Sequence, residues 1–433
     1  MNFNRMLTIG DVAKVFDGPH ATPKKIDTGP YFLSISSLEN GKLDLSKSAH
    51  LSDEDFAKWT RRVTPEAGDI LFSYETRLGE VAMMPAGVTA CLGRRMGLLR
   101  PDRTKILPEY LLYAYQSNAF QEVIRAKTIH GATVDRIALK ELPSFPIQVP
   151  PLKEQQKIVD ILKGYDRKLV LNFETNQTIE EMAQAIFKSW FVDFDPVKAK
   201  MNGEQPEGMD AATASLFPEK LVESEMGLIP EGWDIVSIKD FGSVVCGKTP
   251  SKKNAEFYGG DVPFIKIPDT HGKVFITETT DTLTQAGDES QPKKRIPENS
   301  ICVSCIATVG QVFITTKPSH TNQQINSVVP HDSNSLYYLL FKFKGLSKHF
   351  HDLASGGSAT LNMNTRTFSN VELVRPTADV MEAFHQTIGG LMQKMLTNQL
   401  ENATLAQLRD TLLPKLLSGE IELGSSEELV EAI

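Results

Sequence analysis

Two kinds of hydrophobic pattern alternate along the chain. The first consists of short apolar runs separated by Gly and Pro, such as residues 69–73 and 301–304, which predict β-strands. Helical stretches near 109–126 and 335–353 accompany these runs, so each such region is predicted to be a mixed α+β block. The second pattern is longer. Residues 152–191 contain no Pro and one Gly, and residues 380–417 form a similar stretch, which predicts two long helices.

Apolar positions in both predicted helices recur in steps of four and three. This spacing indicates a coiled-coil seam sustained over about five heptads. The seam of the first helix consists of Ile158, Leu162, Tyr165, Leu169, Asn172, Asn176, Ile179, Ala183, Ile186 and Trp190. Adding 226 gives the seam of the second, which consists of Phe384, Ile388, Leu391, Met395, Asn398, Asn402, Leu405, Arg409, Leu412 and Leu416.

Both seams carry two asparagines at their centre. These side chains could simply be solvated polar positions. In the sharper interpretation the helices lie antiparallel about a pseudo-two-fold axis, so that Asn172 faces Asn402 and Asn176 faces Asn398. A buried polar pair costs stability but penalises slipped registers. A 40-residue helix is a rod of roughly 60 Å, which would hold two globular blocks at a fixed separation.

The chain repeats itself once. Residues 7–11 return as 236–240, Gly18 as Gly247, Thr22-Pro23 as Thr249-Pro250, Pro65-Glu66 as Pro297-Glu298, and Ser73, Gly79 and Val81 as Ser304, Gly310 and Val312. The offset stays between 226 and 232. Because so many matches occur in one order, the chain is predicted to contain two copies of a unit made of one globular block and one long helix.

The charge is unevenly distributed. The 433 residues carry a net charge of −8, from 46 basic and 54 acidic residues, which taken whole argues against a protein that coats nucleic acid. However, residues 201–230 hold one basic and six acidic residues, and residues 377–433 hold three and nine. The two blocks are therefore near neutral with local basic clusters, so nucleic-acid binding by them is possible. With no long apolar run and no visible secretory signal, we expect a cytoplasmic protein and no membrane partner.

Several motifs resemble the specificity (S) subunit of type I restriction–modification systems. They are Pro-Pro-Leu-Lys-Glu-Gln-Gln-Lys-Ile at 150–158, Ala-Ile-Phe-Lys-Ser-Trp-Phe-Val-Asp-Phe-Asp-Pro at 185–196, Gly-Leu-Ile-Pro-Glu-Gly-Trp at 227–233, Thr-Asn-Gln-Gln-Ile-Asn at 321–326 and Leu-Leu-Pro-Lys-Leu-Leu-Ser-Gly-Glu-Ile at 412–421. The resemblance covers nearly the whole chain.

The resemblance, together with the duplication, implies a mixed α+β fold of two tandem target recognition domains, separated by two long helices that form an antiparallel coiled coil. The expected parts are recognition domain 1 (1–150), long helix 1 (151–195), an acidic linker (196–230), recognition domain 2 (231–376), long helix 2 (377–418) and an acidic C-terminal tail (419–433).

The resemblance also implies a function. Each recognition domain would read one half of a split target in double-stranded DNA, and the paired helices would set the spacer and dock two modification subunits. Those partners would bind S-adenosylmethionine and methylate adenine at N6, whereas this chain would hold no cofactor. With restriction (translocase–nuclease) subunits added, the complex would also cleave DNA.

The motif content agrees with a non-catalytic chain. Neither a phosphate-binding Gly-rich loop nor an adenine-methyltransferase tetrapeptide is found in the sequence. Cys302 and Cys305 form one isolated pair in a strand-like run, which is more typical of a core than of a zinc site. No catalytic or metal-binding residue is therefore predicted.

Candidate DNA contacts are clusters of side chains suited to bases or phosphates. In the first block they are Lys24, Lys25, Arg61, Arg62, Tyr74, Arg77, Arg94, Arg95, Thr133 and Arg136. In the second they are Lys248, Thr249, Lys252, Lys253, Lys293, Lys294, Arg295, Gln323, Gln324, Asn362, Asn364 and Arg366. Each cluster could instead be solvated surface, and Arg94-Arg95 or Gln323-Gln324 could simply begin a buried strand.

The candidate positions differ between the blocks, which favours an asymmetric target. One alternative function remains at this point: a duplicated coiled-coil scaffold that recruits partner enzymes without reading DNA sequence.

Overall fold

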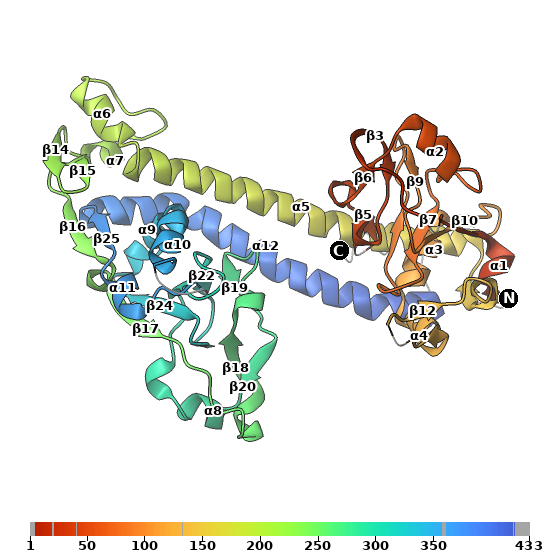
Figure 1. The fold of residues 1–433 in the computed structure, drawn as a ribbon. Helices are drawn as coiled ribbons and strands as arrows, with labels where there is room; N and C mark the ends of the chain where they lie inside the picture. Colours follow the sequence, from red (N-terminus) through yellow and green to blue (C-terminus); the bar gives the residue numbers. More distant parts are fainter. Residues whose placement is uncertain are drawn as a thin grey trace. The chain divides into compact units, whose positions relative to one another are not determined.

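The computed structural model of the chain describes residues 5–19, 21–39, 41–131, 133–356, 361–418 and 420. The chain divides into two compact units. Unit 1 combines residues 1–170 with 403–433, and unit 2 consists of residues 171–402. Each unit therefore contains one globular block and a part of each long helix (Figure 1).

The described part of unit 1 is built mainly of short strands together with short helices. Its strands are β1 (Arg5–Thr8), β2 (Ala13–Asp17), β3 (Ile26–Phe32), β4 (Leu38–Glu39), β5 (Lys42–Leu43), β6 (Ala49–His50), β7 (Ile70–Ser73), β8 (Val81–Met83), β9 (Ala90–Cys91), β10 (Met96–Pro101), β11 (Thr128–Ile129), β12 (Arg136–Ile137) and β13 (Pro146–Val149). Its short helices are α1 (Ile9–Val12), α2 (Asp53–Trp59), α3 (Pro108–Gln116) and α4 (Asn118–Ala126).

Unit 2 repeats much of this arrangement. Its strands are β14 (Leu221–Ser224), β15 (Gly227–Pro230), β16 (Asp234–Ser237), β17 (Gly242–Cys246), β18 (Tyr258–Ile265), β19 (Phe275–Ile276), β20 (Asp281–Leu283), β21 (Ile301–Ser304), β22 (Val312–Thr315), β23 (His320–Thr321), β24 (Ile325–Pro330) and β25 (Glu372–Arg375). Its short helices are α6 (Asp195–Met201), α7 (Ala211–Ser215), α8 (Gln285–Glu289), α9 (Leu336–Gly345), α10 (Ser347–Ala354) and α11 (Thr365–Ser369).

The sheets of the two units share one topology. Unit 1 has a four-stranded sheet in the order β2-β10-β7-β8, and unit 2 has β17-β24-β21-β22 with β19 added at the end. A three-stranded sheet follows the same scheme, β6-β3-β9 in unit 1 and β20-β18-β23 in unit 2, with the last pair parallel in both. The internal repeat predicted from the sequence is therefore a repeat of structure.

Central strands are buried on both faces, which explains their continuous apolar runs. Ile70 and Phe72 of β7 enter the core that includes residues of the long helices, whereas Leu71 enters a second core on the other face. In unit 2, Ile301 and Val303 face the core that includes the long helices and Cys302 faces the opposite one. Cys302 and Cys305 are free, buried core residues.

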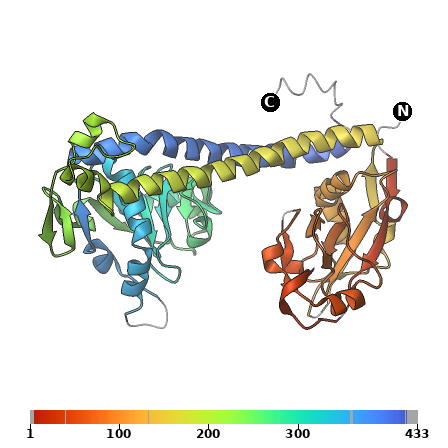
Figure 2. The ribbon, with the colours of Figure 1, turned by 90° about the horizontal axis from the view of Figure 1, so that it is seen from above.

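The long helices are α5 (Leu152–Phe191) and α12 (Ala378–Ser418). In unit 2 they lie side by side (Figures 1 and 2). Asn172 Nδ2 donates a hydrogen bond to Asn402 Oδ1 at 2.9 Å, and Asn398 Nδ2 donates to Asn176 Oδ1 at 2.9 Å. These are the pairs expected for an antiparallel arrangement, because residue numbers rise along one helix as they fall along the other.

Apolar side chains flank this polar layer. In unit 2, Phe187, Trp190 and Phe191 pack against Phe384 with ring centroids 4.9–6.0 Å apart. In unit 1, Ile158 and Leu162 share a buried core with Leu413 and Leu416 of α12. The predicted mixed α+β fold, with two tandem domains and two long antiparallel helices, is confirmed.

The acidic segment 196–230 differs from the linker that was expected. It contains α6, α7 and the β14–β15 hairpin. Ala214, Phe217 and Ile229 are buried, and Phe217 packs edge-on against Trp190 at 5.2 Å between centroids. These apolar residues fix an otherwise charged segment to unit 2, and composition alone did not reveal them. The predicted acidic tail, 419–433, lies outside the described residues except for Glu420. No helix in the described ranges is long and apolar enough to cross a membrane.

Candidate nucleic-acid interface

In unit 1, loops from distant parts of the sequence meet at one edge of the four-stranded sheet. Strands β2 and β7 end where β10 begins, with Gly97 opposite Asp17 and Met96 opposite Ser73. Backbone hydrogen bonds join the loops there, from Gly18 N to Met96 O at 2.9 Å and from Tyr74 N to Arg95 O at 3.2 Å. A further loop joins them through Thr76 N to Asp135 O at 3.2 Å.

Unit 2 assembles the corresponding edge from the corresponding loops. Strands β17 and β21 end where β24 begins, with Cys246 opposite Asn326 and Ser304 opposite Ile325. Gly247 N donates to Ile325 O at 3.0 Å and Cys305 N to Gln324 O at 2.7 Å. The segment 361–366 joins this edge through Met363 N to Cys305 O at 2.9 Å.

Glycine is required where the first loop leaves the edge. A Cβ atom added to Gly18 would lie 2.8 Å from Gly93 O, and one added to Gly247 would lie 2.1 Å from Asn322 O. Both contacts are with backbone, which cannot swing aside, so a side chain would push the loop outward. The internal match of Gly18 with Gly247 therefore reflects the same close approach in both units.

The two edges bring together most of the predicted DNA-contact clusters. At the edge of unit 1 these are Tyr74, Arg77, Arg94, Arg95, Thr133 and Arg136, and at the edge of unit 2 they are Lys248, Thr249, Gln323, Gln324, Asn362, Asn364 and Arg366. Lys24, Lys25, Lys252 and Lys253 lie further along the first loop of each unit. The remaining clusters lie between a short helix and the strand that ends at the edge, which are α2 and β7 in unit 1 and α8 and β21 in unit 2. They consist of Arg61, Arg62, Lys293, Lys294 and Arg295.

Many of these side chains are accessible to a ligand. The exposed set is Lys24, Lys25, Arg61, Arg62, Arg94, Thr133, Arg136, Lys248, Lys252, Lys253, Lys293, Arg295, Gln323, Asn362, Asn364 and Arg366. The half-buried set is Arg77, Arg95, Thr249, Lys294 and Gln324. Asn364 also accepts a hydrogen bond from Thr367 N at 2.9 Å, so it caps α11.

Tyr74 does not fit a DNA contact in this conformation. Its side chain is only 4% exposed and belongs to the core of unit 1. Its hydroxyl has no hydrogen-bond partner among the described residues. Burial, followed by the nearby negative charge of Glu75, raises the pKa of this phenol. Tyr74 continues the alternation of Ile70 and Phe72 and therefore points into the core. Its polar neighbours in the sequence gave no sign of this orientation.

Several predicted arginines are held by carboxylates within their own unit. Arg95 pairs with Glu75 at 3.0 Å and Arg62 with Asp17 at 2.7 Å. Arg77 donates to Ile35 O at 3.0 Å and pairs with Glu80 at 3.2 Å, so it connects two loops. Arg295 pairs with Asp288 at 2.9 Å. These partners lie far away in the sequence or across a turn, which is why they could not be assigned from it.

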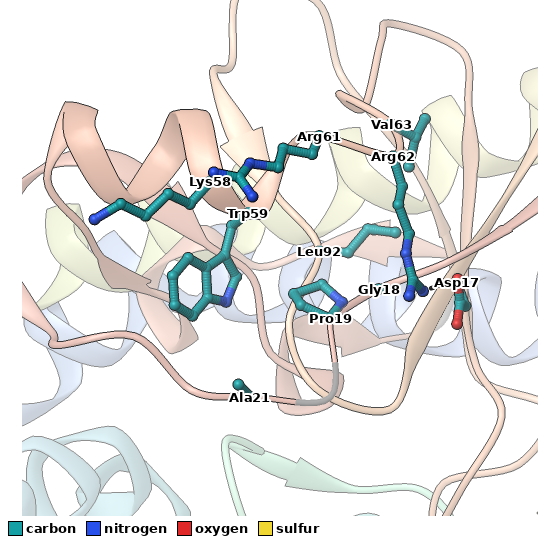
Figure 3. A pocket seen from close by; sticks show the side chains of 10 residues that line it. All are labelled: Asp17, Gly18, Pro19, Ala21, Lys58, Trp59, Arg61, Arg62, Val63 and Leu92. Atoms are coloured by element: carbon teal, nitrogen blue, oxygen red, sulfur yellow. Dashed lines mark hydrogen bonds and ion pairs between the residues drawn. The ribbon is translucent and has the colours of Figure 1, made fainter.

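Arg61 and Arg62 also border a hollow beside the first loop of unit 1 (Figure 3). Its volume is about 500 Å³, and its walls include Gly18, Pro19, Lys58, Trp59 and Leu92. Lys58 and Trp59 of α2 were not predicted as site residues, because the sequence did not show that this segment lies beside the first loop. The nearness of this basic helix end to the edge of the four-stranded sheet could not be inferred without the fold.

In unit 2 the first loop contacts the turn before β24. Thr249 Oγ1 donates to Gln323 Oε1 at 2.7 Å, and Asn322 Nδ2 donates to Gln324 Oε1 at 2.9 Å. No hydrogen bond from the amide N–H groups of Gln323 occurs among the described residues, so these groups can reach an external acceptor. Amide and hydroxyl groups that project from a rigid edge can pair with base edges, whereas exposed Lys and Arg suit phosphates. No group of His, Cys, Asp or Glu that could hold a metal occurs within the part of the chain that the structure describes.

Known proteins share both the sequence and the fold. Residues 4–181 and 230–409 match the family described as type I restriction modification DNA specificity domain. The chain is 44% identical over 366 residues to the type I restriction enzyme HindI specificity subunit of Haemophilus influenzae, covering 75% of this chain and 80% of that one. It is 24% identical over 414 residues to the MjaIX specificity subunit of Methanocaldococcus jannaschii, covering 94% and 87%.

A solved structure supports the same assignment at the level of fold. The type I restriction–modification S subunit from M. genitalium superposes with a TM-score of 0.57 and 16% identity, over 96% of each chain. The family match occurs twice, once over each repeat and its helix. The chain therefore belongs to the family of type I restriction–modification specificity subunits.

Proposed function

We propose that this chain is the non-catalytic DNA-reading subunit of a type I complex and that each unit reads one half of a bipartite, asymmetric target. One observation carries the proposal: two sheets of the same topology present equivalent loops at the same edge, but with different side chains. Unit 1 offers Arg94 and Arg136, whereas unit 2 offers Gln323 and Asn362. Because Arg favours guanine and Gln or Asn favours adenine, the two half-sites should differ.

Phosphate neutralisation would be shared with partner subunits. The net charge is −8, and Arg62, Arg95 and Arg295 are already paired with carboxylates. A weakly basic reader gains little affinity from counterion release on its own. Two modification subunits would supply the remaining positive charge, bind S-adenosylmethionine and methylate adenine, and restriction subunits would add cleavage.

A competition gel shift tests the reading function. The full chain, with and without its modification subunits, is mixed with a labelled duplex that carries the cellular target and with unlabelled competitor at physiological salt. We expect sequence-specific retention that strengthens when the modification subunits are present. Equal competition by unrelated DNA under every condition would instead support the alternative, a scaffold that recruits enzymes without reading sequence.

The paired helices would set the spacer between the half-sites and dock the modification subunits. Antiparallel pairing through Asn172, Asn176, Asn398 and Asn402 supports this part of the proposal, since a paired rod keeps its length. Inserting one heptad into both helices next to the asparagines should change the spacer and leave both half-sites intact. A spacer that does not change would exclude the helices as a ruler.

A further inference from the structure

A chain of buried polar side chains lies beneath the first reading loop of unit 2. Asp288 of α8, Gln291 and His320 of β23 are 8%, 7% and 0% exposed. His320 Nε2 lies 2.6 Å from Asp288 Oδ1, and His320 Nδ1 lies 3.3 Å from Gln291 Nε2. Arg295 closes the outer end by pairing with Asp288 at 2.9 Å.

The direction of every hydrogen bond in this chain is determined. Gln291 Nε2 donates to the backbone oxygen of Lys248 at 2.8 Å, so the amide nitrogen must face that carbonyl. An amide nitrogen can only donate, so His320 Nδ1 must accept from it. The ring proton then lies on Nε2 and is donated to Asp288. The chain therefore runs from a charged pair to the carbonyl of a loop residue, and each member has a partner.

The loop is fixed at three points of its backbone, while its side chains remain available. Gly247 packs against the backbone of Asn322, Lys248 N donates to Thr321 O at 2.9 Å, and Lys248 O accepts from Gln291. The Lys248 side chain is exposed, and the next residue, Thr249, bonds to Gln323. Removing the Gln291 bond would free one carbonyl and let this part of the edge shift.

Stability alone does not explain why this place is polar. Buried polar chains cost desolvation, and apolar packing of similar volume is often as stable or more stable. Unit 1 demonstrates that alternative. There, Phe32, Leu51 and Cys91 form an apolar cluster against Phe56 and Trp59, and Trp59 borders the same hollow as Gly18 and Pro19 of the first loop.

The counterpart of Gln291 in unit 1 makes no such bond. Trp59 and Gln291 each stand six residues before a matching proline, Pro65 and Pro297. The indole N–H of Trp59 has no hydrogen-bond partner among the described residues. Within the described parts of both units, the hydrogen-bonded chain Asp288–His320–Gln291 thus occurs in unit 2 alone.

We propose that Gln291, held by His320 and Asp288, is a positioning residue that determines how sharply unit 2 reads its half-site. This inference rests on the proposed function, since it concerns the same edge. Gln291 contacts no DNA itself. It holds the Lys248–Thr249 backbone against the turn that carries Gln323. The Lys248 ammonium and the Gln323 amide are thereby kept at a fixed separation for contact with base edges.

The test is Gln291→Met, which keeps the volume of the side chain and removes the donor. The full chain is expressed with its modification subunits, and methylated adenines are mapped on a library of targets with single-base changes in either half-site. We expect discrimination in the half-site of unit 2 to fall about tenfold, which is within the contribution of one well-placed base contact. Discrimination in the half-site of unit 1 should not change.

The matched control is Gln285→Met, in which the same substitution removes an exposed amide of α8 that donates a hydrogen bond to Glu289. It should leave both half-sites unchanged. If Gln291→Met fails to fold, Gln291→Asn shortens the side chain so that it no longer reaches Lys248 O, and the same expectation applies. Full discrimination at both half-sites, or an equal loss at both in a folded variant, would overturn the inference. Absence of sequence preference in the unsubstituted chain would overturn the proposed function instead.

Discussion

The two units differ in the side chains that lie beside their first loops. In unit 1, Trp59 borders a hollow beside the loop and belongs to an apolar cluster around Leu51 and Cys91. In unit 2 the loop is bonded by Gln291, which the hydrogen-bonded chain Asp288–His320–Gln291 holds in place. The strands above are equivalent, with β9 parallel to β3 and β23 parallel to β18. The position of the edge therefore follows from the order of the strands, which the two units share. The side chains beside the first loop can differ between the two copies without changing that order.

The largest expected effect comes from disrupting the hydrogen-bonded chain of unit 2. Asp288→Ala leaves His320 and Arg295 without their carboxylate. The substitution leaves the buried N–H of His320 without an acceptor and Arg295 without its counter-ion, so the free energy of unfolding of unit 2 should fall by about 3–4 kcal/mol. Denaturant unfolding followed by hydrogen exchange resolves the loss by unit. A loss below about 1 kcal/mol would mean that the chain of bonds contributes little.

A somewhat smaller loss of stability is expected from disrupting the apolar cluster of unit 1. Leu51 is fully buried between Phe32 and Cys91, so Leu51→Ala removes apolar contacts and leaves a cavity. The free energy of unfolding of unit 1 should fall by about 3 kcal/mol, measured by the same method. Unit 2 should be unaffected, and an equal shift in both units would contradict independent support of the two loops.

A third prediction concerns the paired asparagines of the long helices in unit 2. Asn398 is fully buried and its Oδ1 has no partner among the described residues. The double variant Asn176→Leu with Asn398→Leu should therefore raise the free energy of unfolding by about 1–2 kcal/mol, because apolar packing replaces an incompletely bonded pair. Thermal melting tests this expectation, and a lowered melting temperature would show that the layer stabilises the pair.

The smallest effect concerns thiol chemistry. Burial raises the pKa of Cys91 to about 12, that of Cys302 to about 12 and that of Cys305 to about 11. At pH 8 a thiol with a pKa near 12 is ionised to only about 10⁻⁴, so it reacts slowly. Titration of the native chain with a thiol reagent should modify Cys246 first, the one half-buried cysteine. Reactivity of the other three should appear only as pH rises toward 11 or on unfolding, and rapid modification of Cys91 at pH 8 would contradict its burial.

Much of the fold could be predicted because its signals are periodic or repeated. The four-three spacing from Ile158 to Trp190 predicted the first long helix, and the same spacing 226 residues later predicted its partner. The paired asparagines gave a direction and a register, which the hydrogen bonds at Asn172 and Asn398 match. Matching glycines at 18 and 247 marked positions where only the absence of a side chain permits a close approach.

The rest depended on contacts between residues far apart in the sequence. Tyr74 lies among polar neighbours in the sequence but points inward. The partners of Arg62 and Arg295, which are Asp17 and Asp288, cannot be identified without the fold. His320 was not singled out at all, since one histidine in a short strand gives no signal of a bonded chain. The acidic stretch 196–230 read as a linker because charge outweighed its few buried apolar residues.

Mapping of methylated adenines in cells that express this chain with its modification subunits tests the central claim most directly. Two units of one topology with different edge side chains should give one bipartite target whose two half-sites differ in sequence and are separated by a fixed spacer. A perfectly palindromic target would contradict the claim that the two units read different half-sites, and methylation without any bipartite sequence would contradict the claim that each unit reads one half.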